Sequence, residues 1–388
     1  MVIDVKKFTN CKFLHVIGMN ELKYSIPLVE LINNNPQHFN AKEHAFVTAH
    51  RDVYKKLEHY DNVFLFEENF ESEMGTCFSV PIINKCGANA KWIIVHDQWF
   101  LKSLIRIKPW IRKKIIWRTW GGALFYNYKP TKTILDIFKN TIKVILNGLP
   151  PKIIKRFFAI GTANIVDEIE LKKIVGNVKT YPMSYCTKDM YKIVEKEYER
   201  GKEKSKCVNI LVGHSGFAQD NHIENIERLS DYSKQNIKVY FSFAYGEREY
   251  MECVKTKAKE VFGEKAVFIE EFLPFEEYVA FLNRMDVAIL DALHSTALYN
   301  LAILMQLKKK IYINRNGLYY EAMQTEGIPC YYSDEIQSTT FDKFASENVA
   351  ASMYGNSDLL FKDYETDLKN WEKIFEDLNL ILLQNKNK

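Results

Sequence analysis

At 388 residues the chain is long enough for two domains, and its composition, 47% apolar and 26% charged, excludes a largely disordered protein. The seven cysteines form no Cys-x-x-Cys pair and the N-terminus has no signal-peptide core, which predicts a cytoplasmic protein with reduced thiols. No stretch approaches the ~20 apolar residues of a membrane span. The net charge is +4, but residues 91–160 hold 15 Lys or Arg against two acids, so this window alone carries +13. A local excess of this size favours an anionic partner.

The first half of the chain alternates short apolar runs with helical patterns. Strands are predicted at 12–18, 45–48, 63–66, 91–96, 114–120, 156–160 and 179–181. Strands that alternate with helices predict a parallel sheet covered on both faces. The charge-dense stretch 191–206 then indicates the end of a helix and an interdomain linker.

The same alternation restarts after the linker. Strands are expected at 208–212, 237–243, 266–269, 286–290, 309–313 and 328–332, and helices at 221–234, 247–262, 274–284, 296–307 and 317–325. Residues 364–384 form a final amphipathic helix. We predict an α/β fold with two Rossmann-like doubly wound domains facing a central cleft, where ligands bind at the carboxyl ends of the strands. The expected domains are 1–200 and 207–360, with the helix of 364–388 packing back toward the first.

A short turn, Gly213-His214-Ser215-Gly216, follows the strand 208–212, and Asp220 or Asn221 can cap the helix after it. Main-chain N–H groups of such a turn and the helix dipole favour an anion, and glycine lets a phosphate approach closely. An ordinary turn that needs glycine only for its dihedral angles is the alternative, because a lone Gly-x-x-Gly falls short of the dinucleotide fingerprint. Without that fingerprint a dehydrogenase is disfavoured.

Several segments, in order and at fitting spacing, together resemble one family between Phe13 and about residue 333. They are Leu14–Gly18, His96–Gln98, Trp117–Gly121, Ile210–Gly216, Ala244–Gly246, Phe275–Leu282 and Asn314–Arg315. The family is that of the bacterial TDP-N-acetylfucosamine:lipid II N-acetylfucosaminyltransferases, which are GT-B glycosyltransferases of enterobacterial common antigen assembly. The resemblance implies an enzyme that moves a deoxyamino sugar, such as 4-acetamido-4,6-dideoxygalactose, from a dTDP-sugar to a polyprenyl-diphosphate-linked glycan. This sequence departs from the family pattern at three places, Gly121–Leu124, His214 and His294–Leu298.

The resemblance places the nucleotide-sugar donor on the second domain. Its diphosphate is expected to meet the turn 213–216 and the N-terminus of the helix after strand 286–290, where Ser295 or Thr296 is a natural N-cap. Tyr245 is a candidate for stacking on the base, and Asn314 and Arg315 for contacting the diphosphate; a loop tyrosine and a surface arginine are equally good interpretations. The chain contains no Asp-x-Asp magnesium anchor, so no metal ion and no other cofactor is expected.

The acceptor and the catalytic base are expected on the first domain. His96 and Asp97 follow a predicted strand end, where a base that deprotonates the acceptor hydroxyl belongs; a histidine that only fixes the loop is the alternative. The resemblance adds further acceptor contacts, although tryptophan packing and a core-facing His15 are the competing interpretations. These residues are His15, Gly18, Gln98, Trp117, Trp120 and Gly121.

The basic window 91–160 interleaves cations with Leu, Ile and Trp, which fits an anionic membrane surface and a lipid diphosphate. We therefore expect a cytoplasmic protein attached peripherally to the inner face of the cell membrane. A merely solvated basic face is the alternative, and no nucleic-acid module is visible. Two other functions remain open: a glycosyltransferase that uses a UDP- or GDP-sugar, for example in O-antigen or capsule assembly, and a nonenzymatic protein that binds nucleotide sugars or polyanions.

Overall fold

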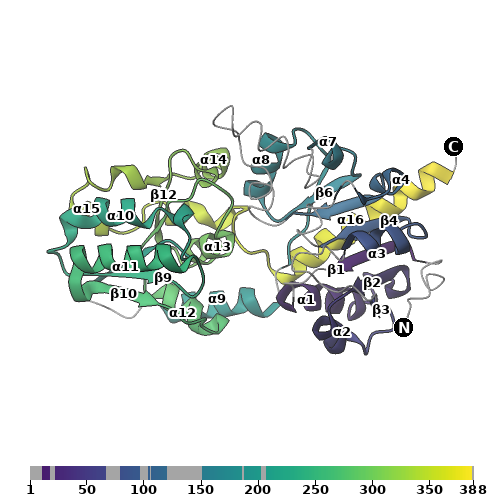
Figure 1. Cartoon of the computed structure of the whole chain (residues 1–388), viewed down its shortest axis with the longest axis horizontal. Helices are drawn as coiled ribbons and strands as arrows, with labels where there is room; N and C mark the ends of the chain where they lie inside the picture. The colour runs from purple at the N-terminus through teal and green to yellow at the C-terminus, as the bar shows by residue number, and fades with distance from the viewer. Residues whose placement is uncertain are drawn as a thin grey trace. The chain divides into compact units, whose positions relative to one another are not determined.

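The computed structural model describes residues 11–17, 22–66, 79–96, 104, 106–119, 151–185, 188–201 and 207–386 (Figure 1). The chain divides into two compact units, Met1–Thr187 with Asp363–Lys388, and Lys188–Lys362. Helix α9 (Lys188–Arg200), which the sequence analysis placed in the first domain, belongs to the second unit because it packs against α12 (Phe275–Asn283) and α13 (Leu298–Gln306).

The first unit is built on a parallel sheet with the strand order β3-β2-β1-β4-β5-β6-β7. Its strands are β1 (Phe13–Ile17), β2 (His44–Thr48), β3 (Val63–Leu65), β4 (Trp92–Val95), β5 (Ile115–Arg118), β6 (Ala159–Thr162) and β7 (Thr180–Pro182). The described helices are α1 (Leu22–Asn33), α2 (Arg51–Leu57), α3 (Ser79–Cys86), α4 (Pro109–Arg112), α7 (Pro151–Ile154), α8 (Ile165–Ile174) and α16 (Tyr364–Lys386). The order reverses between β1 and β4, which is the switch point where doubly wound sheets bind ligands.

The second unit repeats this plan with the order β10-β9-β8-β11-β12-β13, also parallel. Its strands are β8 (Val208–Val212), β9 (Ile237–Ser242), β10 (Ala266–Ile269), β11 (Val287–Leu290), β12 (Lys310–Ile313) and β13 (Tyr331–Tyr332). Besides α9, α12 and α13, the helices are α10 (His222–Leu229), α11 (Arg248–Phe262), α14 (Leu318–Thr325) and α15 (Phe341–Ala345). Here the switch point lies between β8 and β11.

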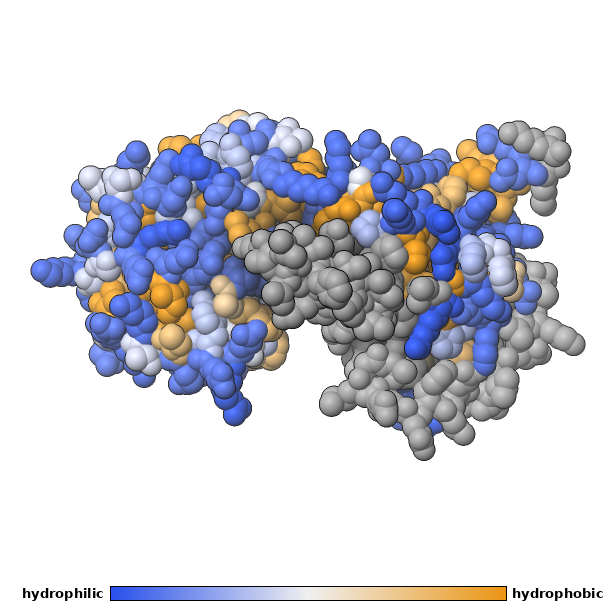
Figure 2. All heavy atoms as spheres, turned by 45° about the horizontal axis from the view of Figure 1, so that its top comes forward, coloured by the Kyte–Doolittle hydropathy of each residue, from blue (hydrophilic) through white to orange (hydrophobic). Residues whose placement is uncertain are grey.

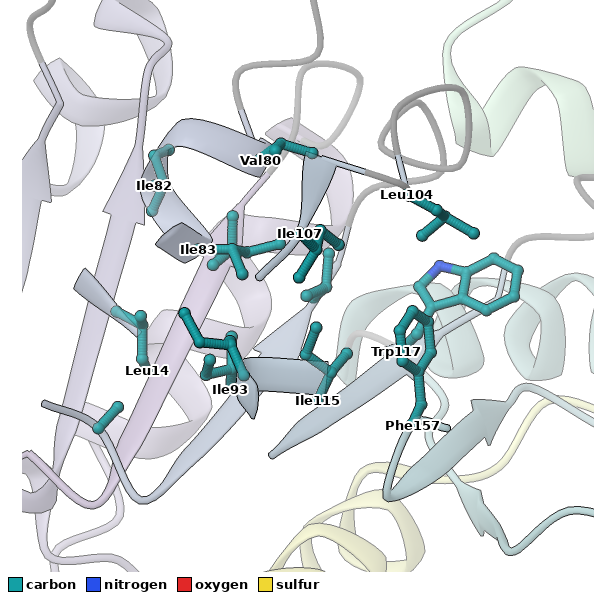
Figure 3. Close-up of a cluster of buried hydrophobic side chains, with 14 of the residues drawn as sticks. Leu14, Val80, Ile82, Ile83, Ile93, Leu104, Ile107, Ile115, Trp117 and Phe157 are labelled. Atoms are coloured by element: carbon teal, nitrogen blue, oxygen red, sulfur yellow. The ribbon is translucent and has the colours of Figure 1, made fainter. Parts of the chain in front are cut away.

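Strands buried on both faces explain the continuous apolar runs in the sequence. In the first unit Leu14, Ile93 and Ile115 lie on neighbouring strands and pack with helix residues in one apolar cluster (Figure 3). Trp117 of β5 is completely buried in this cluster, beside Phe157. Its indole therefore belongs to the core, which favours the competing interpretation of tryptophan packing, and the acceptor contact of Trp117 stays a prediction.

None of the helices in the described part of the chain is long and apolar enough to span a membrane. One of these helices, α16, carries exposed apolar side chains. Figure 2 shows such side chains, in orange, toward the C-terminal end of α16, where Leu380 and Leu383 are exposed.

Candidate functional site

The turn after β8 uses its own N–H groups internally. The N–H of His214 and that of Ser215 both donate to Oδ2 of Asp220, at 3.1 and 3.0 Å. The N–H of Gly213 donates to Ile289 O and that of Gly216 to Tyr245 O. The sequence analysis expected these amides to hold a diphosphate. In this structure the Asp220 carboxylate binds these amides instead. Any contact of this turn with the nucleotide sugar therefore has to come from side chains.

Asp220 also orients the His214 ring. Nδ1 of His214 lies 2.9 Å from Oδ1 of Asp220, and both side chains are more than nine-tenths buried. Burial raises the pKa of the Asp220 carboxyl, but the charge and hydrogen bond of His214 outweigh it and hold that pKa below its usual value. An ionised carboxylate keeps the proton of His214 on Nδ1, so Nε2 is the ring atom left for a ligand.

His222 is the second histidine of this turn. Its Nδ1 lies 3.3 Å from the Tyr250 hydroxyl, while its buried Nε2 has no hydrogen-bond partner within the described structure. Burial lowers the pKa of His222 to about 4, so the ring is neutral at pH 7. Gly213, at φ +70°, leaves room for this ring, because an added Cβ would lie 2.4 Å from Nε2 of His222. This packing, rather than a phosphate, accounts for the first glycine.

The turns after β8 and β9 are joined through two glycines. Gly216 and Gly246 form a parallel bridge, and a Cβ on Gly246 would lie 2.3 Å from the Cα of Gly216. The close approach places Tyr245 beside His214, with ring centroids 6.4 Å apart. Two loops of the second unit thus present their side chains at one edge of the sheet, the edge at which the strands end.

Tyr245 and Phe272 form an exposed aromatic pair at this carboxyl edge. Their rings are parallel within 6°, with centroids 5.8 Å apart, and they are 44% and 75% exposed. The sequence analysis identified Tyr245 but missed Phe272. The signal was a single aromatic residue, Phe272, in the loop between the predicted strand 266–269 and Pro274. A flat, exposed pair of rings is suited to stack a planar ligand group.

The segment just before helix α13 carries Thr296. The helix begins at Leu298, and its N-cap is Ala297 at φ +59°, so neither Ser295 nor Thr296 is the N-cap as predicted. Ser295 and Thr296 are both buried, and Oγ1 of Thr296 has no hydrogen-bond partner in the part of the chain described. In the first turn, Asn300 accepts a hydrogen bond from Tyr278 at 3.0 Å.

The remaining donor candidates follow β12. Asn314 closes its own turn by accepting from the N–H of Asn316. Arg315 is exposed, pairs with Asp334 at 3.3 Å and Glu335 at 2.6 Å, and lies 3.8 Å over the ring of Tyr332. Its guanidinium is thus engaged by two carboxylates, which does not support the predicted diphosphate contact.

Beneath this edge lies an ion pair that the sequence analysis missed. Arg228 Nη1 lies 2.6 Å from Oδ2 of Asp291, which is completely buried at the end of β11. Asp291 also accepts from Ser333 and Asn225, and its main-chain oxygen accepts from Asn221. The network joins the ends of β11 and β13 to helix α10 and the residue before it.

In the first unit, His96 follows β4 at the switch point but is buried. Its Nε2 lies 3.1 Å from Nδ1 of His15, and its Nδ1 hydrogen-bonds the Tyr185 hydroxyl. Because both ring nitrogens are bonded within the protein, His96 has no lone pair free to meet an acceptor hydroxyl directly. His15 is likewise buried and contacts only protein through its ring nitrogens. The other candidates, Gly18, Asp97, Gln98, Trp120 and Gly121, lie outside the described residues.

Within the described ranges, no three His, Cys, Asp or Glu side chains are arranged to hold a metal ion. The prediction of a metal-independent enzyme stays a prediction.

The amino-acid sequence matches a family model over residues 11–356, and that family is described as 4-alpha-L-fucosyltransferase, glycosyl transferase group 56. Comparison with curated proteins gives no match.

Similar solved structures include a glycosyltransferase from Rickettsia africae, at 12% identity and a TM-score of 0.54, covering 95% of this chain and 98% of that chain. The alpha,alpha-trehalose 6-phosphate synthase from Burkholderia multivorans matches at 10% identity and a TM-score of 0.60, covering 97% and 98%. Anabaena HepE in complex with UDP and glucose matches at 10% identity and a TM-score of 0.58, covering 94% and 100%. At these identities the likeness concerns the fold alone, and it confirms the predicted GT-B fold with two doubly wound domains.

Proposed function

Because the chain belongs to the 4-alpha-L-fucosyltransferase family, glycosyl transferase group 56, and is therefore a hexosyltransferase, we propose that it moves a deoxyamino sugar from a dTDP-sugar to a lipid-linked glycan. The sugar is 4-acetamido-4,6-dideoxygalactose or a close relative, and the acceptor carries a polyprenyl diphosphate. Such a reaction serves the assembly of a bacterial surface polysaccharide, namely common antigen, O-antigen or capsule.

The observation that carries the donor assignment is the Tyr245–Phe272 ring pair beside the His214–Asp220 pair, at the carboxyl edge of the second sheet. The base of the nucleotide stacks on the exposed rings, an interaction typically worth about 1–3 kcal/mol per base. The diphosphate then reaches His214. The aromatic pair, which suits the base, thus lies next to a hydrogen-bonding side chain, which suits the diphosphate.

The diphosphate is held by side chains in this proposal. Oγ1 of Thr296 donates to a phosphate oxygen, and so does Nε2 of His214 when it carries a proton in addition to the one on Nδ1, since the amides of residues 213–216 are engaged. The buried Thr296 hydroxyl, without a partner in the described structure, is satisfied by a phosphate oxygen. Asn314 and Arg315 border the same edge, and Arg315 contributes only if it leaves Asp334 and Glu335.

The acceptor is bound by the first unit. His96 and Tyr185 lie at the carboxyl edge of its sheet, and Asp97 follows His96 directly in the sequence. Since both ring nitrogens of His96 are bonded, it acts on the acceptor hydroxyl through a neighbour, either Tyr185 or Asp97. Gly18, Gln98, Trp120 and Gly121 remain proposed acceptor contacts from the family resemblance.

Peripheral membrane attachment is supported by α4. Trp110 is 67% exposed, and Arg106, Lys108 and Lys113 around it are exposed as well. An exposed indole among cations is the arrangement that binds the headgroup region of an anionic bilayer. The inner face of the cell membrane offers both this surface and the lipid-linked acceptor.

A UDP-sugar is the competing donor. HepE is similar in fold, and its structure contains UDP and glucose. At 10% identity this similarity concerns the fold and does not identify the base or the sugar that this chain binds. Distinguishing the two requires a direct comparison of nucleotides.

Thermal-shift titrations with dTDP, UDP and GDP test the proposal. We expect dTDP to stabilise the protein most, and Phe272→Ala and Tyr245→Ala each to weaken dTDP binding about ten-fold or more. Trp110→Ala removes an equally exposed aromatic from the first unit and should leave dTDP binding unchanged. Preference for UDP or GDP would overturn the dTDP-sugar donor, and unchanged binding in both variants would overturn the assigned site.

Transfer is tested with labelled dTDP-sugar and a polyprenyl-diphosphate-linked glycan in vesicles that contain anionic lipid. Product is expected with this acceptor, and Trp110→Ala is expected to reduce sedimentation with the vesicles. If sugar moves only to water or to a soluble glycan, the lipid-linked acceptor is wrong.

A further inference from the structure

Three histidines and a tyrosine form one continuous hydrogen-bonded chain across a face of the first sheet. His44 Nδ1 lies 3.0 Å from His15 Nε2, and His15 Nδ1 lies 3.1 Å from His96 Nε2. His96 Nδ1 then hydrogen-bonds the Tyr185 hydroxyl. The histidines come from three adjacent strands, since β1 pairs with both β2 and β4.

This hydrogen-bonded row runs diagonally across one face of the sheet. His44 opposes Phe13 in the register, His15 lies two residues further along β1, and His96 lies one residue beyond the Val16–Val95 pair. Residues two apart on a strand share one face, so the three rings lie in a row on the same side. His96 and Tyr185 mark the carboxyl edge of the sheet, and His44, the first residue of β2, marks the opposite edge.

The geometry of the rings suits transfer along their N–H bonds. The planes of His15 and His44 differ by 25°, and those of His15 and His96 by 12°. In nearly coplanar rings, an N–H of one points along the lone pair of the next. Each nitrogen of His15 faces another imidazole, so the ring donates through one nitrogen and accepts through the other.

Aromatic side chains enclose the row. Phe46 stacks on His15 at 4.4 Å, Phe375 of α16 meets the edges of His15 and His44, and Trp371 lies near His96. Among the described residues, charged groups act on the row at its two ends. Lys12, paired with Glu43, acts on His44, and Arg118 acts on His96 and lies 4.8 Å over the Tyr185 ring.

Burial lowers the pKa of His44 and of His96 to about 3 and that of His15 well below its usual value. Each ring is therefore neutral at pH 7 and carries one proton. A row of neutral rings has two polarities, with all protons directed toward His44 or all directed toward Tyr185.

We propose that this row, His44–His15–His96 with Tyr185, is a proton relay for the transfer reaction, carrying the proton of the acceptor hydroxyl away from the carboxyl edge of the sheet. This proposal rests on the proposed transferase function. As the acceptor oxygen bonds to the anomeric carbon, the bond from that carbon to the diphosphate breaks and the hydroxyl proton moves to Tyr185. Tyr185 passes its own proton to His96, His96 to His15, and His15 to His44, which releases one to water. The row changes polarity, no ring becomes charged, and the diphosphate keeps both electrons of the broken bond.

His15 is the residue to test, because it is the middle of the row and both of its ring nitrogens are bonded to other histidines. His15→Gln keeps one donor and one acceptor but has no second titrating nitrogen. We expect kcat to fall about ten- to a hundred-fold with KM for the donor unchanged. The solvent deuterium isotope effect on kcat should change as well. His59→Gln is the same substitution at an exposed histidine and should leave both quantities unchanged.

Chemical rescue separates transfer from packing. In His15→Gly, added imidazole should restore part of kcat, whereas 1-methylimidazole, which fills the same space but has no N–H, should not. Equal rescue by both compounds, or an unchanged kcat in His15→Gln, overturns the relay. Should His15→Gly fail to fold, the His15→Gln measurements decide alone. Absence of transfer by the wild-type enzyme with every nucleotide sugar would instead count against the proposed function.

Discussion

Asp220 accepts hydrogen bonds from both the main-chain N–H and the hydroxyl of Ser215, at 3.0 and 2.8 Å, and so occupies the position in which an anionic ligand was expected. The turn that resembles a phosphate-binding loop thus carries its own carboxylate. That carboxylate fixes the loop and orients the His214 ring.

Replacement of Asp220 by Asn should therefore destabilise the protein. The amide has one acceptor oxygen for the donors of His214 and Ser215, which the two carboxylate oxygens now share. The negative charge that holds the His214 ring is also lost. We expect a decrease of about 2–3 kcal/mol in the free energy of unfolding, measured by urea denaturation. Asp231→Asn, an exposed carboxylate in the same unit, should change it by less than about 0.5 kcal/mol. Equal effects of the two variants would contradict the assigned role.

Gly213 and Gly327 give a matched pair for the packing of His222. Their φ angles are +70° and +69°, but a Cβ meets Nε2 of His222 at 2.4 Å only at Gly213, whereas no described atom lies within 4 Å at Gly327. Gly327→Ala should cost about 1 kcal/mol for the left-handed backbone alone. Gly213→Ala should cost at least about 2 kcal/mol more, because a buried ring must move. Similar unfolding midpoints for both variants would show that the His222 ring moves aside without cost and would contradict this packing role of Gly213.

The buried pair of Arg228 and Asp291 should contribute far more than a surface pair. Arg228→Met leaves the completely buried carboxylate of Asp291 without its cation, at an expected cost of about 3 kcal/mol. Lys257→Met removes the exposed Lys257–Glu260 pair at 3.6 Å and should cost less than about 1 kcal/mol. Urea denaturation of the two variants measures the difference. A cost for Arg228→Met no larger than that for Lys257→Met would be inconsistent with the network.

The row of histidines predicts a loss of stability in mild acid. The pKa values of His15, His44 and His96 are lowered by folding, whereas an unfolded histidine has a pKa of about 6.5. Above about pH 6.5 these histidines are neutral in both the folded and the unfolded chain, so the free energy of unfolding is at its full value there. Below that value the unfolded chain takes up protons that the folded chain does not, so each histidine lowers stability by about 1.4 kcal/mol per pH unit; for His44 and His96 this continues until pH falls to their folded pKa of about 3.

Urea midpoints at pH 7 and pH 5.5 measure this dependence, before most carboxylates titrate. His15→Gln should reduce the pH-dependent loss by about 1.4 kcal/mol, while His59→Gln should leave it unchanged. An identical loss in wild type and His15→Gln would mean that His15 is protonated in the folded protein.

The sequence predicted the kind of each element well because that information is local. Apolar runs of four to six residues became strands in both halves, with β8, at Val208–Val212, the clearest case. The helix at Tyr364–Lys386 was recognised by its apolar spacing, and the parallel sheets by the alternation of strands and helices. The candidate site was located only roughly: Tyr245 and His214 lie together, whereas Trp117 is core and Phe272 was missed.

Local patterns alone determined that this chain folds as two doubly wound sheets whose strand ends carry the polar side chains. Which side chains meet was decided by tertiary structure. His44, His15 and His96 are separated by 29 and 81 residues, and they touch because β1 lies between β2 and β4 in one particular register. A shift of one residue in that register would turn a ring to the opposite face, since side chains alternate along a strand, and no local pattern encodes it.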